Sequence, residues 1–307
     1  MNDQTKNQEK VVEIAGYHLG KVGGAGYSDQ YNPDLLVAIP RKYNREAYGI
    51  EEDNLPFVGN DVWNCYEVSA ITTKGRPVAG MMKIVYSSDS PLHVESKSIK
   101  LYLNSFNMTK MGNTEKECIA LMEQKVEEDL SVSLKTNVKA KLFTNSNAPE
   151  FDMNKQGFIY LDALVDLDEV EFNVFKSDAS QLKGADDVVT DEVIKISSNL
   201  LRSNCRVTNQ PDWGDVYIHM EGTNTPDYES IARYIVSHRQ VSHFHEEIVE
   251  MVFTHLTQAY KPNKLMVAAL YTRRGGLDIN PIRATHQDMI PEAFTSTEYI
   301  NRKTLRQ

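Results

Sequence analysis

Alternating apolar and polar positions predict strands in both halves of the chain. In the first half the alternation runs over residues 63–72 and 77–86, with Lys74-Gly75 as a turn between them. Strand-like stretches follow at 131–143 and 158–164. In the second half residues 215–220 alternate, and 265–271 form a short apolar run that we interpret as a closing strand. A period of two indicates strands with one buried face.

Helical spacing separates these predicted strands. Residues 96–106 place Leu101, Leu103 and Phe106 at helix-like positions. Thr114 and Glu117 then match a capping box, which marks a helix start. The stripe expected to be buried on that helix is Ile119, Leu121, Met122 and Val126. In the second half Thr225-Pro226 predicts a helix start, and helical spacing runs from 244 to 260 through Ile248, Met251, Val252 and Leu256.

The order of these elements predicts the fold class. Each half has the order strand, strand, helix, helix, strand, strand. Residues 102–106 (YLNSF) and 234–238 (YIVSH) also share tyrosine, aliphatic and serine positions. This order favours an α+β fold of antiparallel sheets with helices on one face, not a parallel doubly wound sheet. A nicotinamide would therefore not be bound by a Rossmann turn. The glycine-rich run 20–26 matches no phosphate-binding motif and is interpreted as a loop.

Composition narrows the class of protein. The chain has 307 residues and a net charge of −10, whereas nucleic-acid-binding proteins usually carry a basic face. A small-molecule substrate is therefore favoured. The three cysteines and the absence of a secretion signal in the polar residues 1–10 indicate reduced thiols in a cytoplasmic protein. No apolar run is long enough to span a bilayer.

Cys205 is the candidate nucleophile. It lies among polar, turn-forming residues, so a loop is expected around it, whereas Cys65 and Cys118 fall in predicted elements and are interpreted as packing residues. The neighbouring Arg206 could favour the thiolate, the reactive form of cysteine. Asp212 could close back on the sulfur and handle protons, with burial beside Trp213 keeping its pKa high. Alternatively, Asp212 only forms the turn after Pro211.

Residues 243–247 (HFHEE) contain two histidines but lack a metalloprotease motif. That motif needs a second histidine one turn after His245, and position 249 is Val. No metal is therefore expected. His245 could donate a proton, and the two oxygens of Glu246 could accept two N–H donors from a purine-like ring. A solvated acidic helix end is the alternative for Glu246.

Two further segments carry residues suited to ligands. Glu95-Ser96-Lys97-Ser98 precedes a predicted helix, where serine is usually a cap. Arg273-Arg274-Gly275-Gly276 follows a predicted strand. Its glycines allow close approach of a ligand, and its arginines suit a phosphate.

Taken together, these segments resemble the 7-cyano-7-deazaguanine reductases, the nitrile reductases of queuosine biosynthesis, a tRNA modification pathway. The matching segments are 95–106 (ESKSIKLYLNSF), 205–213, 244–246 and 271–281 (YTRRGGLDINP). Residues 40–45 and 55–57 are similar to the longer, two-module subfamily. The resemblance covers about residues 19–283. It departs at His238, where the family commonly has Phe, and in a slightly longer spacer before Phe244.

The resemblance implies a fold, an activity and a set of site residues. It implies a tunnelling fold (T-fold), with an extension at 1–55, a first module at 56–170 and a second at 171–307, and a homodimer. It implies two NADPH-dependent reductions through a thioimide on Cys205, with Asp212 as proton donor and His245 near the nitrile. The substrate residues would be Val94, Glu95, Ser96, His245 and Glu246, and the NADPH residues Ser96, Lys97, Arg274 and Gly275.

Two other functions remain open from the residues. One is a different tunnelling-fold enzyme acting on a purine-like ring, either a zinc-dependent cyclohydrolase or an amidine-forming relative. The other is a non-catalytic module that binds deazapurines, which would keep Glu246 but would not need Cys205 with Asp212.

Overall fold

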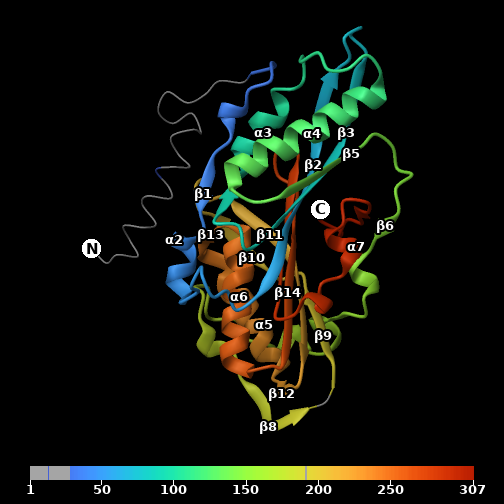
Figure 1. Cartoon of the computed structure of the whole chain (residues 1–307). Coiled ribbons are helices and arrows are strands. Elements are labelled where there is room, and N and C mark those ends of the chain that lie inside the picture. Colours follow the sequence, from blue (N-terminus) through green and yellow to red (C-terminus); the bar gives the residue numbers. More distant parts are fainter. Residues whose placement is uncertain (1–12, 14–27, 191) are drawn as a thin grey trace.

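The structure, a computed structural model, describes residue 13, residues 28–190 and residues 192–307 (Figure 1). The glycine-rich run 20–26 and residues 1–10 lie outside the described residues. One large sheet runs through the described part of the chain, in the order β13-β10-β11-β14-β15-β2-β3-β5, with β9 also on β11 and β7 on β9. All neighbours along this path are antiparallel except β13 on β10, and β7 on β9 is also parallel.

The strands of this sheet are β2 (Val58–Ile71), β3 (Pro77–Ser87), β5 (Val138–Phe143), β7 (Ile159–Tyr160), β9 (Ile194–Ser198), β10 (Arg202–Cys205), β11 (Pro211–Glu221), β13 (Ser242–His243), β14 (Lys264–Tyr271) and β15 (Leu277–Ala284). Three small pairs accompany it: β1 (Ala38–Pro40) with β4 (Leu92–Val94), β8 (Gly184–Thr190) with β12 (Thr223–Pro226), and β6 (Glu150–Phe151) with β16 (Ile300–Asn301).

The helices are α2 (Lys42–Arg45), α3 (Ser96–Asn104), α4 (Glu115–Leu134), α5 (Tyr228–Ser237), α6 (His245–Tyr260) and α7 (Glu292–Thr295). Short 3-10 turns lie at Pro33–Leu35, Glu46–Tyr48, Met153–Lys155, Leu161–Ala163, Leu167–Glu169, Ala179–Gln181, His238–Gln240 and Gln287–Met289. Among the described residues, no helix has the length and apolar character that a membrane crossing requires. The predicted α+β class with antiparallel sheets is confirmed.

Several predicted boundaries were wrong for local reasons. The helix expected at Thr225-Pro226 begins later, because Pro226 ends β12 and Asp227 caps α5 by accepting from the Glu229 amide. Residues 131–134 are the last turn of α4, not a strand. Thr114 does cap α4, and Met122 and Val126 are buried as predicted, but Leu121 is 42% exposed. The buried stripe continues through Cys118, Leu130 and Leu134.

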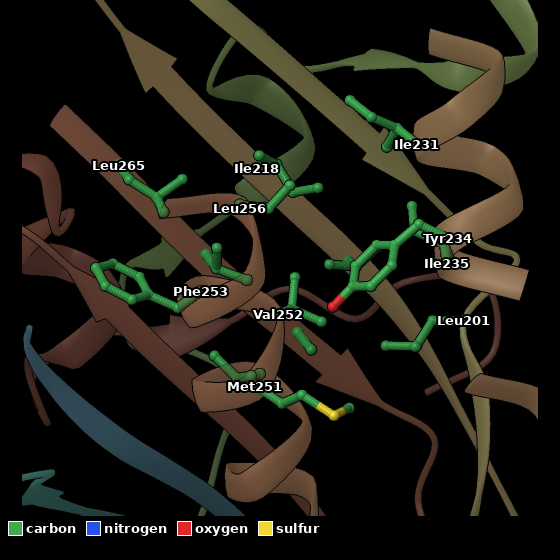
Figure 2. Packing of buried hydrophobic residues seen from close by; sticks show 14 of the residues in the cluster. Leu201, Ile218, Ile231, Tyr234, Ile235, Met251, Val252, Phe253, Leu256 and Leu265 are labelled. Carbon is green, nitrogen blue, oxygen red and sulfur yellow. The ribbon is translucent and has the colours of Figure 1, made fainter. Parts of the chain in front are cut away.

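The helices α3 to α6 cover one face of the sheet. Buried residues of α3 and α4 pack on β2, β3 and β5. Those of α5 and α6 pack on β9, β11 and β14, where Tyr234, Val252 and Leu256 meet Ile218 (Figure 2). The opposite face is covered by a C-terminal segment whose Phe294, in α7, packs with Val62 on β2 (Figure 1). The expectation of helices on one face therefore holds for α3 to α6 but not for α7.

The two halves correspond as their sequence similarity suggests. Tyr102 and Tyr234 are both fully buried near the ends of α3 and α5. In each case the serine three residues later, Ser105 or Ser237, donates its hydroxyl to the tyrosine carbonyl at 2.6 Å. The same helix ending is thus built twice.

β14 is not the closing strand that the apolar run predicted. The following strand, β15, pairs with β14 on one side and with β2 on the other. It joins the sheets of the two halves into one. All eight residues of β15 are buried, and its short alternation over Leu277-Asp278-Ile279-Asn280 is interrupted by Pro281, a residue that argues against a central strand.

Candidate active site

A cavity of about 510 Å³ opens where the two halves meet. Its walls come from β4 and the start of α3 in the first half, and from the β10–β11 hairpin, the start of α6 and the β14–β15 turn in the second. Every site residue that the family resemblance implies lies on this wall, namely Val94, Glu95, Ser96, Lys97, Cys205, Asp212, His245, Glu246, Arg274 and Gly275.

Cys205 and Asp212 lie on neighbouring strands of a tight hairpin. Cys205 ends β10, and Asp212 is the second residue of β11, where it pairs with Ser203. The backbone closes the turn, since the Cys205 amide donates to the Gln210 carbonyl at 2.8 Å. Asn209 supplies a left-handed conformation with φ of 54°, which asparagine tolerates. The expected loop is thus limited to residues 206–210, and the Asp212 side chain has no part in closing it.

Arg206 does not serve the role suggested by its position next to Cys205. Its guanidinium donates to Glu247 at 2.7 Å and to Asn44 at 2.7 Å. Glu247 is buried and also contacts Nδ1 of His243 at 2.7 Å. The charge of Arg206 is therefore paired with a carboxylate, and the contact ties the Cys205 hairpin to the first turn of α6.

Asp212 contacts an arginine and a histidine. Its Oδ1 accepts from Arg274, and its Oδ2 lies 3.5 Å from Nε2 of His245. Burial raises the pKa of Asp212, but the hydrogen bond and charge of His245, together with Arg274, outweigh burial and hold the pKa below its usual value. The expectation that burial beside Trp213 keeps this pKa high is wrong. The Trp213 ring instead lies among Arg202, Arg239 and Arg306.

His245 begins α6 and packs at a tilt against the buried ring of Tyr271. Its imidazole is centred 3.9 Å from the ring of Tyr271, with 34° between the planes. Since Oδ2 of Asp212 is near one ring nitrogen, stacking and the carboxylate together fix the imidazole at the cavity wall.

Glu246, the next residue, is only 4% exposed, so it is not a solvated helix end. Its Oε1 has no hydrogen-bond partner among the described residues. The nearest polar group is Nδ1 of His93, at 3.6 Å. A buried carboxylate oxygen without a donor is costly, and it indicates a ligand that brings one.

Glu95, rather than Ser96, caps α3. Its carboxylate accepts from the Ser98 amide at 2.7 Å, and the Ser96 hydroxyl also donates to it. Burial raises the pKa of Glu95, and the backbone N–H groups of Lys97 and Ser98 offset part of that effect. The cap leaves this carboxylate on the cavity wall facing the second half of the chain.

Three cationic side chains form part of the cavity wall. Lys97, Lys100 and Arg274 line the cavity together with Gly275, whose φ of +58° favours a glycine. Lys100 pairs with Glu67 at 3.1 Å. Cations beside exposed backbone form a donor set that fits phosphates. Arg273, grouped with Arg274 in the sequence, instead lies 3.7 Å from the centre of the Tyr66 ring.

The sequence analysis did not identify His93, Trp63 or Gln210, which also line the cavity. His93 could have been noticed because it is two residues before Glu95. Trp63 and Gln210 gave no such signal, since one reads as a strand residue and the other as part of a turn. Among the described residues, no three His, Cys, Asp or Glu side chains gather as a metal site would need.

Comparisons with known proteins agree with this site. Residues 27–142 match the family described as nitrile reductase, 7-cyano-7-deazaguanine-reductase N-terminal domain, and residues 211–289 match the QueF-like proteins. The NADPH-dependent 7-cyano-7-deazaguanine reductase of Colwellia psychrerythraea is 37% identical over 94% of the chain and 98% of its own length. That of Paraburkholderia xenovorans is 42% identical over 89% and 95%. The chain therefore belongs to the 7-cyano-7-deazaguanine reductase family of nitrile reductases.

Proposed function

We propose that the chain reduces the nitrile of 7-cyano-7-deazaguanine to a primary amine, with NADPH, through a thioimide on Cys205. The product, 7-aminomethyl-7-deazaguanine, serves queuosine biosynthesis. One observation carries the proposal: a single cavity brings together a cysteine, a carboxylate held by cations, a buried carboxylate lacking a donor, and a cationic rim.

The first step is addition of the Cys205 thiol across the C≡N bond. The sulfur forms a bond to the nitrile carbon, one π bond of the nitrile breaks, and nitrogen takes up the thiol proton. Asp212 is suited to carry that proton, because its lowered pKa makes it a carboxylate that can accept from sulfur and then give to nitrogen. A thiolate attack splits one hard reduction into easier steps. His245, held against Tyr271, orients Asp212 from the side.

Recognition of the base falls to the two buried carboxylates. Glu246 would accept the ring and exocyclic N–H donors of the deazapurine, which supplies the partner that Oε1 lacks. Glu95, on the facing half of the chain, would contact the same base together with Val94 and Ser96. A binding site lined by carboxylates favours a neutral base with N–H groups and disfavours acidic ligands.

The cationic residues of the cavity wall suit NADPH. Ser96, Lys97, Arg274 and Gly275 would hold it, with the cations paired to its phosphates. When bound, NADPH supplies hydride, and two molecules are needed to take a nitrile to an amine. Because Arg274 also contacts Asp212, the residue that binds the cofactor touches the proton carrier.

We further propose the finer architecture that the family resemblance implies. This is a tunnelling fold with an extension at 1–55 and modules at 56–170 and 171–307, acting in the cytoplasm as a homodimer without direct contact to nucleic acid. The packing of α3 and α4 on one part of the sheet and of α5 and α6 on another supports two modules. Sedimentation analysis would test the dimer.

Oxidation of NADPH in the presence of the nitrile tests the activity. We expect nitrile-dependent oxidation with NADPH in preference to NADH, and a large loss of efficiency with NADPH in Arg274→Ala. Arg273→Ala is the matched control, since this neighbouring arginine stacks on Tyr66, and it should keep the cofactor preference. Oxidation independent of the nitrile, or an unchanged preference in Arg274→Ala, would contradict the proposal.

A further inference from the structure

His93 has two buried nitrogens that the fold leaves without partners. It lies in the middle of β4, opposite Ile39 of β1, and is 2% exposed. Neither ring nitrogen has a hydrogen-bond partner within the described part of the chain. A buried imidazole normally finds at least one partner, because leaving both nitrogens dry is costly. Since His93 lines the cavity, the missing partner can come from a ligand.

The neighbours of His93 give its ring a definite orientation. The ring meets that of Phe244 edge to face, with centres 5.0 Å apart and 73° between planes. Its Nδ1 lies 3.6 Å from the unpartnered Oε1 of Glu246. Beside a carboxylate oxygen an N–H is favoured over a lone pair, so we infer that Nδ1 carries a proton. The N–H donor of His93 and the carboxylate acceptor of Glu246 are thus neighbours in a buried part of the cavity wall.

This pair complements one edge of a guanine-type ring. That edge presents a carbonyl oxygen, then a ring N–H, then an exocyclic amino group. Glu246 can accept from the two N–H donors, but a carboxylate cannot satisfy the carbonyl oxygen. An N–H donor is needed next to it, and His93 Nδ1 occupies that place.

We propose that His93 is a specificity-determining residue, which donates Nδ1–H to the ring carbonyl of the deazapurine beside Glu246. The inference rests on the proposed function and adds to it a residue that distinguishes an oxo base from an amino base. A base with an amino group in place of the carbonyl would present a donor to a donor. Sites that hydrogen-bond a substrate group reject analogues lacking it strongly, because a buried polar group is then left unpaired.

Titration calorimetry in the Cys205→Ala background tests this proposal without turnover. The two ligands are 7-cyano-7-deazaguanine and its analogue with an amino group in place of the carbonyl. The measured quantity is the ratio of their dissociation constants. The analogue also loses the ring N–H that Glu246 accepts, so the quantity compared is the change in this ratio between wild type and each His93 variant, which reports the part of the selectivity that depends on His93.

We expect His93→Leu to lower the selectivity ratio by about tenfold to a hundredfold, in line with loss of one buried hydrogen bond. His93→Asn should keep most of the ratio, because an asparagine amide nitrogen can stand near the place of Nδ1. His238→Phe is the matched control. This buried histidine bonds to the Tyr234 carbonyl at 2.9 Å, away from the cavity, and its replacement should leave the ratio unchanged.

The outcomes separate this inference from the function beneath it. If the oxo base binds and His93→Leu keeps the wild-type ratio, even with a lower melting temperature, His93 is a packing residue and the inference fails while the function stands. If the oxo base does not bind the Cys205→Ala chain at all, the proposed function and the inference both fail. If the selectivity ratio falls in His93→Leu and is largely kept in His93→Asn, the result supports recognition of the carbonyl by His93.

Discussion

Asp212 shows how a single residue combines opposing influences. Burial disfavours its charge, yet His245 and Arg274 stabilise the carboxylate and lower its pKa. In the proposed mechanism Asp212 would therefore begin the reaction as a base and would become an acid only after Cys205 gives up its proton. The turn-forming alternative finds no support at this residue, because backbone hydrogen bonds close the hairpin and Asp212 contacts side chains instead.

Replacing Asp212 by Asn should lower nitrile reduction by at least about a hundredfold, the usual contribution of a general acid or base. Asn keeps the size of the side chain but cannot carry the proton. Turnover and melting temperature are to be measured together. Asp215→Asn is the control, since Asp215 is buried on the same strand and pairs with Arg306 rather than lining the cavity. A fully active Asp212→Asn enzyme would exclude the proton role.

At the scale of elements, the first turn of α6 organises the site. His245 and Glu246 face the cavity, and Glu247 is buried behind them. Glu247 accepts from the Phe244 amide at 3.3 Å, from Arg206 and from Tyr48. Burial raises the pKa of Glu247, but His243 and Arg206 hold it below its usual value. One carboxylate thus caps the helix and fixes the Cys205 hairpin.

We predict that Glu247→Gln destabilises the fold by about 1–3 kcal/mol, the cost of an impaired buried hydrogen-bond partner. The Cys205 hairpin should loosen with it, so amides in residues 205–210 should exchange faster with deuterium. Glu229→Gln serves as the control. Glu229 lies in the exposed first turn of α5, and its ion pair among the described residues is with Arg233. Unchanged exchange in residues 205–210 would mean that Glu247 does not hold the hairpin.

How much of the fold the sequence could predict depends on how regular the pattern of apolar residues is in each element. β2, β3 and α6 were found from the periodicity of their apolar positions, and the motif residues around the cavity were found from resemblance. β15 was missed because Pro281 interrupts its alternation after four residues. The pKa of Asp212 and the pairing of Arg206 depend on Arg274 and Glu247, which are distant in sequence, so local pattern could not reveal them.

At the scale of the whole molecule, the site exists only because the two halves share one sheet. β2 and β15 pair along eight residues, and a buried ionic network crosses this junction. Asp61 on β2 pairs with Arg41 at 2.5 Å and with Arg283 on β15 at 2.9 Å. Arg283 and Arg45 both reach Glu250 of α6. The network therefore connects the N-terminal segment, the junction of the sheets and the helix that carries Glu246.

Asp61→Asn should destabilise the fold by about 3–5 kcal/mol, because it leaves buried arginines undercompensated. Burial raises the pKa of Asp61, but Arg283 and Arg41 outweigh it and lower the pKa from 3.8 to about 2. A lowered folded pKa gives stability that is full above the unfolded pKa and lost as pH falls through the folded one. The wild-type advantage over Asp61→Asn should therefore shrink between about pH 4 and pH 2.

Denaturant unfolding across this pH range would measure the difference. Asp288→Asn is the control, since Asp288 pairs with Lys264 at the surface and its side chain is 66% exposed. It should leave the unfolding midpoint nearly unchanged. An Asp61→Asn protein as stable as wild type at neutral pH would show that the junction does not depend on the ionic network.

The covalent adduct on Cys205 is the central claim, and intact-mass spectrometry tests it most directly. The wild-type chain mixed with 7-cyano-7-deazaguanine, without NADPH, should gain one substrate mass. Cys205→Ala should gain none, while Cys118→Ala, which changes a buried core cysteine of α4, should still form the adduct. An adduct that persists in Cys205→Ala, or a wild-type chain that binds the nitrile without any gain in covalent mass, would contradict the thioimide mechanism.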